Sequence, residues 1–242
     1  MDGVTYSPND FVYIDVETGG LDPNSDSLLE VAYAVGNGPI KVLYPDLTYA
    51  LESANPKALE VNKFVERFTA EDEVGKWVGV PAEYNQAGID ALNNVNGKLV
   101  GLAFLDLPRA STDERWMEFF ADVEGKIPVG ANVHFDVAFV QQYWSPDRIP
   151  WNHRLLSLNA WGAGVIGSPA TVGFQDLIDH IDEHLAHNDL RSRVPAIDHT
   201  AAGDVEATRA VHQWLIWEHI TARAEDDTAV PKFLWDEVPE DS

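Results

Sequence analysis

The segment FVYIDVETGGL at residues 11–21 constrains the fold of this chain more than any other stretch. Its apolar and β-branched residues predict a strand over residues 10–16. Because alternate side chains of a strand share a face, Asp15 and Glu17 are expected on one side. Val12, Ile14 and Val16 are expected on the other. A strand that is apolar on both faces is usually central in its sheet and covered on both sides.

Two carboxylates at the end of such a strand have two interpretations. Close carboxylates repel each other and lose solvation, and a divalent cation such as Mg²⁺ or Mn²⁺ relieves both costs through oxygen ligands. Alternatively, Glu17 and Thr18 only begin a turn that Gly19 and Gly20 close. This segment by itself leaves both interpretations open.

The rest of the chain alternates strand and helix patterns. Further strands are predicted at residues 27–35, 40–44, 98–107, 127–130 and 154–158. Helices are predicted from Asn55 and Pro56 onward, over 111–123, after Asn132, over 172–186 and over 203–222. Such an order predicts an α/β fold in layers, with helices packed on a central sheet.

Composition excludes several classes of protein and site. The chain has no cysteine, which excludes disulfides and thiolate zinc sites. No signal peptide and no membrane-length apolar run are evident, so we expect a soluble, cytoplasmic protein with no membrane partner. The net charge of −24 argues against nucleic-acid binding through a broad basic surface. It still permits binding of a strand end through metal ions and backbone donors.

Two further motifs carry carboxylates at the starts of predicted helices. In GANVHFD, residues 130–136, Asp136 falls one turn inside a helix that follows a strand. In HTAAGD, residues 199–204, His199 precedes Asp204 by five positions, and Asp204 opens the last long helix. An acid is favoured there by the positive end of the helix dipole.

The three motifs together resemble the DEDDh family of 3′-to-5′ exonucleases. The family's Asp-x-Glu-Thr corresponds to Asp15 through Thr18, its Asn-x-x-x-Asp to Asn132 through Asp136, and its His-x-x-x-x-Asp to His199 through Asp204. The motifs occur in the family's order, and the resemblance covers roughly residues 10–220. It implies an RNase H-like three-layer fold with a central mixed five-stranded sheet flanked by helices. The chain departs from the pattern at Gly19, where a second Thr is common, and at Ala131, where His is common.

The resemblance also implies roles for individual residues. Asp15, Glu17, Asp136 and Asp204 would hold two Mg²⁺ (or Mn²⁺) ions, and His199 would act as general base. Candidate substrate contacts are Thr18, Gly19, Leu21 and Asn132. The implied reaction removes nucleoside 5′-monophosphates from the 3′ end of single-stranded DNA or a frayed primer, in proofreading or DNA repair. A DNA polymerase is a further candidate partner.

The expected organisation is one exonuclease domain at residues 1–222, with an insertion at 70–110, followed by an acidic tail at 223–242. Two alternative functions remain. One is an oligoribonuclease-like enzyme acting on short RNA, although that group usually has Glu-Met-Thr where this chain has Glu17, Thr18 and Gly19. The other is a non-catalytic, acidic interaction protein, which would not need to keep all five candidate site residues.

Overall fold

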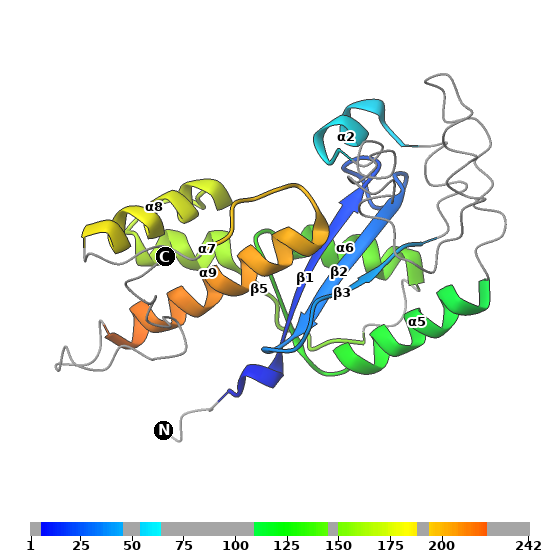
Figure 1. Cartoon of the computed structure of the whole chain (residues 1–242), viewed down its shortest axis with the longest axis horizontal. Coiled ribbons are helices and arrows are strands. Elements are labelled where there is room, and N and C mark those ends of the chain that lie inside the picture. Colours follow the sequence, from blue (N-terminus) through cyan, green and yellow to red (C-terminus); the bar gives the residue numbers. More distant parts are fainter. Residues whose placement is uncertain (1–5, 46–53, 64–108, 145–149, 188–193, 222–242) are drawn as a thin grey trace, which may run out of the picture.

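A five-stranded sheet forms the centre of the molecule (Figure 1). The computed structural model describes residues 6–45, 54–63, 109–144, 150–187 and 194–221. The strands are β1 (Phe11–Thr18), β2 (Leu28–Val35), β3 (Lys41–Leu43), β4 (Ile127–Gly130) and β5 (Leu156–Ser157), arranged in the order β3-β2-β1-β4-β5. β1 is antiparallel to β2, which is antiparallel to β3, whereas β1, β4 and β5 run parallel. The sheet is therefore mixed, as expected.

β1 is the central strand, with two strands on either side, and both of its faces are covered. Val12, Ile14 and Val16 belong to one buried cluster and Tyr13 belongs to the other. Tyr13 also forms a buried hydrogen bond of 3.0 Å between its hydroxyl and Nδ1 of His212. The period of two in the sequence thus gives the correct face for Val12, Tyr13, Ile14 and Val16.

Two helical layers cover the sheet (Figure 1). On one face lie α5 (Arg109–Val123) and α6 (Val133–Trp144), whose Trp116, Phe119 and Val140 belong to the same buried cluster as the valines of β1. On the other lie α7 (Leu158–Val165), α8 (Phe174–His187) and α9 (Ala201–Thr221). A single 3-10 turn (Pro8–Asp10) precedes β1, and α2 (Pro56–Val61) lies beside its carboxyl end. The predicted α/β fold in layers, with a central mixed five-stranded sheet flanked by helices, is confirmed by this arrangement.

Helix α7 is an element that the sequence pattern did not predict. Its segment LNAWGAGV contains two glycines, which lower helix propensity. Packing compensates, because a Cβ at Gly162 would lie 2.6 Å from a methyl carbon of Leu177 on α8. The two helices can therefore approach closely only because residue 162 has no side chain.

Several predictions concern residues that the structure does not describe. The strand at 98–107, most of the insertion at 70–110 and the tail at 223–242 fall outside the described residues, so the domain boundaries stay a prediction. Within the described part of the chain, no helix combines the length and apolar character needed to cross a membrane.

Candidate active site

The carboxyl end of β1 extends past its parallel neighbour. β4 pairs with β1 only from Phe11 to Tyr13, so Asp15 and Glu17 lie beyond the end of β4. The first turns of α6 and α9 lie near this part of β1, and each contains an aspartate, Asp136 and Asp204 respectively. Residues 189 positions apart in the chain are thereby brought to one edge of the sheet.

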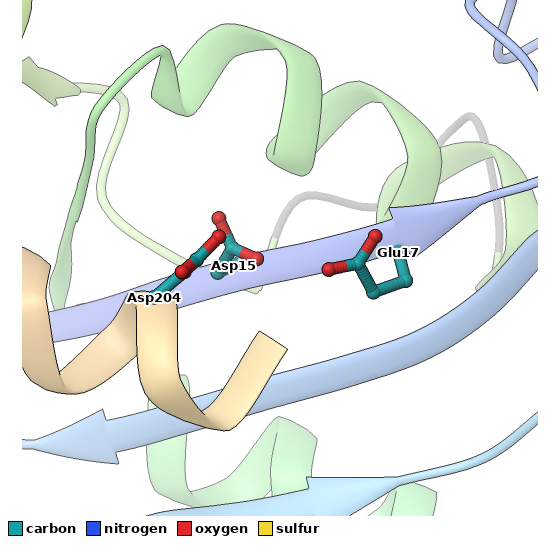
Figure 2. Close-up of side chains that lie close together, drawn as sticks. All are labelled: Asp15, Glu17 and Asp204. Atoms are coloured by element: carbon teal, nitrogen blue, oxygen red, sulfur yellow. The ribbon is translucent and has the colours of Figure 1, made fainter. Parts of the chain in front are cut away.

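Asp15, Glu17 and Asp204 form a cluster that fits a cation (Figure 2). One carboxylate oxygen from each lies within 4.8 Å of those of the other two, and all three residues are partly buried. Asp15 and Glu17 project from β1, and Asp204 projects from the start of α9. Glu17 and Thr18 are the last residues of the strand, so the predicted turn begins only after them.

Asp136 lies beside this cluster and is anchored to the same strand. Its Oδ1 accepts a hydrogen bond of 3.2 Å from the backbone N–H of Val16, and the residue is only 6% exposed. The bond fixes the carboxylate of α6 against the carboxyl end of β1. Asp136 also interacts electrostatically with Asp15, which places it at the margin of the cluster.

Burial and mutual repulsion make these acids hard to ionise. Burial, followed by the charges of Asp136, Asp204, Glu17 and Glu30, raises the pKa of Asp15 well above its usual range. Burial raises the pKa of Asp136 to about 7, against the opposing effect of its backbone hydrogen bonds. Burial and the neighbouring Asp198 raise the pKa of Asp204 to about 6. The protein thus concentrates negative charge where solvation is poor.

The residues present fit a divalent cation. All the donors are carboxylate oxygens, which hard cations such as Mg²⁺ and Mn²⁺ prefer. Oδ1 of Asp204 is buried and has no hydrogen-bond partner among the described residues. A buried acceptor without a partner is costly, and a cation would satisfy it while reducing the repulsion within the cluster.

His199 lies in an exposed turn immediately before α9. Its imidazole is close enough to Asp204 to influence the pKa of that carboxyl. Its backbone has φ +59°, a left-handed conformation that few residues other than glycine adopt. The imidazole is therefore next to the acidic cluster and accessible to solvent.

A cavity of about 570 Å³ adjoins the cluster on the side of α2. Glu17 belongs to its wall, so the cavity and the carboxylates are continuous. Leu21 is 84% exposed and Val61 55% exposed, and both line the cavity together with Phe135. Lys57 is the only cationic residue among the described residues of the wall. The site therefore combines an acidic end, an apolar surface and one positive charge.

The four candidate substrate contacts fall in different places. Thr18 and Leu21 line the cavity. Gly19 is buried, and both its backbone groups are used internally, with its N–H donating to Ser27 and its carbonyl accepting from Asn55. Asn132 is exposed just before α6 and is not part of the cavity wall.

Sequence reasoning missed the residues that α2 contributes to the cavity, among them Asn55, Lys57 and Asn62. The helix start at Asn55 was recognisable, and its side chain does cap α2 by accepting from the N–H of Lys57. Helix α2 is joined to the end of β1 by a hydrogen bond of 2.6 Å from the N–H of Asn55 to the carbonyl of Gly19, and by one of 3.4 Å from Nδ2 of Asn62 to the carbonyl of Thr18. No local pattern in the sequence signals either bond.

No family model matches the chain, and no curated protein matches it. Among solved structures, the chain is similar to E. coli exonuclease I in complex with a dT13 oligonucleotide, at 17% identity and a TM-score of 0.44. That match covers 88% of this chain and 42% of the other. A zinc-bound complex of the same enzyme with single-stranded DNA gives 16% identity and a TM-score of 0.46, over 88% and 41% of the two chains. The chain thus spans less than half the length of these proteins, and at such identity the likeness concerns the fold alone.

Proposed function

We propose that this protein is a divalent-metal-dependent 3′-to-5′ exonuclease that acts on single-stranded DNA or frayed 3′ ends. The observation that carries the proposal is the cluster of Asp15, Glu17 and Asp204, with Asp136 anchored beside it. Three separate sequence motifs supply these four acids, and the fold brings them to one edge. The same motifs led to the resemblance with the DEDDh exonucleases.

In the proposed mechanism, Asp15, Glu17, Asp136 and Asp204 would together hold two divalent cations. Bound cations of this kind neutralise the charge of the scissile phosphate and make an attacking water more acidic. An imidazole nitrogen of His199 would accept the proton of that water as the general base. The leaving group is the 3′-oxygen of the preceding nucleotide, so each cleavage releases a nucleoside 5′-monophosphate.

The cavity beside Glu17 is proposed to take the terminal nucleotide. Its volume of about 570 Å³ lies within the range of small-molecule sites. The apolar side chains of Leu21, Val61 and Phe135 offer contact area to an unpaired base, and Lys57 offers a positive charge to a phosphate. A base held in this way is unpaired, which favours single strands and frayed ends over intact duplex.

The test uses 5′-labelled oligonucleotides, one single-stranded and one with a recessed 3′ end, incubated with Mg²⁺, Mn²⁺ or EDTA. A ladder that shortens from the 3′ end, and that is lost in EDTA and in Asp15→Asn, would support the proposal. The matched control is Asp182→Asn, the same change at an exposed position of α8. Full activity of Asp15→Asn would contradict the proposed function.

RNA of matched sequence belongs in the same assay. A strong preference for short RNA would favour the oligoribonuclease-like alternative, with the same acids and base. Absence of cleavage on every substrate would favour the non-catalytic interaction protein.

A further inference from the structure

The turn that carries His199 is held by a network of hydrogen bonds that starts at Asp198. Oδ1 of Asp198 accepts from the backbone N–H of Thr200 at 2.9 Å and from its hydroxyl at 2.8 Å. Oγ1 of Thr200 in turn accepts from the N–H of Gly203 at 3.0 Å, and its carbonyl accepts from the N–H of Asp204 at 2.9 Å. The network therefore connects the side chain of Asp198 to the first turn of α9.

His199 lies inside this network in an unfavourable backbone conformation. At φ +59°, a residue with a side chain is strained by roughly 1 kcal/mol or more. Such a conformation persists only where its surroundings hold it. The two hydrogen bonds to Asp198 cross from the residue before His199 to the residue after it, so they close the turn on both sides.

Gly203 provides an independent sign that the position of Asp198 matters. A Cβ at residue 203 would lie 2.3 Å from Oδ1 of Asp198 and 2.6 Å from its Cγ. The carboxylate of Asp198 thus occupies the space that any side chain at 203 would need. In HTAAGD, the glycine before Asp204 is what lets this carboxylate lie against the helix.

We propose that Asp198 is a positioning residue for His199: its carboxylate oxygen holds the turn that places the imidazole next to Asp204. This inference rests on the proposed function, because it takes His199 to be the general base. The role belongs to the acceptor oxygen and not to the negative charge. Asparagine has the same oxygen at the same place, whereas alanine has none.

The role predicts a specific pattern among variants. Asp198→Ala should lower kcat roughly 10- to 100-fold with KM within about twofold, because the base moves while the cavity and the carboxylates stay. Asp198→Asn should stay within about threefold of wild type. Gly203→Ala should resemble Asp198→Ala, since it displaces the carboxylate. Gly164→Ala is the matched control, because an added Cβ at this exposed glycine of α7 contacts nothing within 4 Å.

The experiment combines steady-state kinetics on a 5′-labelled single strand in Mg²⁺ with amide hydrogen exchange of the same proteins without metal. We expect Asp198→Ala and Gly203→Ala to lose protection at the N–H groups of Thr200 and Gly203, and Asp198→Asn to keep it. If Asp198→Ala kept the amide exchange rates and the kcat of the wild-type protein, the proposal would be overturned. Equal loss in Asp198→Asn and Asp198→Ala would also overturn it, by assigning the effect to charge. If the wild-type protein cleaves no oligonucleotide, the proposed function fails, and the exchange rates alone decide whether Asp198 holds the turn.

Discussion

Replacing Asp136 by Asn should stabilise the metal-free protein while abolishing its activity. Asn keeps the Oδ1 that accepts from the N–H of Val16 and removes a negative charge from a residue that is 6% exposed. Loss of a proposed ligand normally weakens a protein only when the metal is present. In EDTA, Asp136→Asn is expected to be more stable than wild type, because the buried negative charge of Asp136 lowers the free energy of unfolding.

The magnitude follows from the pKa of Asp136, which burial raises from 3.8 to about 7. The folded state holds this proton more tightly than the unfolded state, so the free energy of unfolding falls as pH rises from about 4 to about 7. A tenfold change in proton affinity is worth about 1.4 kcal/mol, so the cost at pH 8 is about 4 kcal/mol. At pH 5 the cost in free energy of unfolding is about 2 kcal/mol, because Asp136 still keeps its proton in the folded protein.

Urea unfolding in EDTA at pH 5 and pH 8 measures this difference. Asp136→Asn should be more stable than wild type at both values, and more so at pH 8. Asp182→Asn, the same change on an exposed face of α8, should leave stability within about 0.5 kcal/mol. Equal stability of wild type and Asp136→Asn at pH 8, or a gain that does not depend on pH, would refute the reasoning.

Three further outcomes are expected. Mg²⁺ should raise the melting temperature more at pH 8 than at pH 5 in differential scanning fluorimetry, because burial and Asp198 raise the pKa of Asp204 to about 6 and its proton competes with the cation below that pH. Lys57→Met should raise KM about two- to fivefold at unchanged kcat in steady-state cleavage assays. The control Lys126→Met, which lies just before β4 at the end of the strand away from the carboxylate cluster, should change neither KM nor kcat. Phe119→Ala, at a fully buried position against Tyr33 and Trp116, should lower the free energy of unfolding by about 3–5 kcal/mol in urea, with the cleavage products unchanged.

The sequence was informative wherever function and fold depend on local periodicity. Alternation in β1 gives the faces of Val12 through Glu17, and the acids at the starts of α6 and α9 are recognisable from motif order and spacing. These features are local because each needs only one strand or one helical turn. The roles of the acids as metal ligands stay predictions that the assays above address.

The remaining features depend on pairs of residues that are distant in the chain. Tyr13 and His212 pair across 199 positions, and α2, which carries Lys57, is joined to the end of β1 by the bonds from Asn55 to Gly19 and from Asn62 to Thr18. Helix α7 forms despite its two glycines because Gly162 packs against Leu177. Tertiary contacts override propensity in each case, which is why single-segment reasoning could not find them.

The charge of −24 is compatible with the proposed function, as three of the described cationic residues illustrate. Lys41 is paired with Glu118 and Asp122, and Arg209 donates to the carbonyl of Gly38, so both have structural roles. Lys57 is the cation that faces the cavity. A surface of this kind repels a phosphate chain along most of its length, in contrast to proteins that bind through a broad basic surface. Around the described part of the site, attraction would come from the proposed cations of the carboxylate cluster and from Lys57, which suits recognition of one strand end and not of a long duplex.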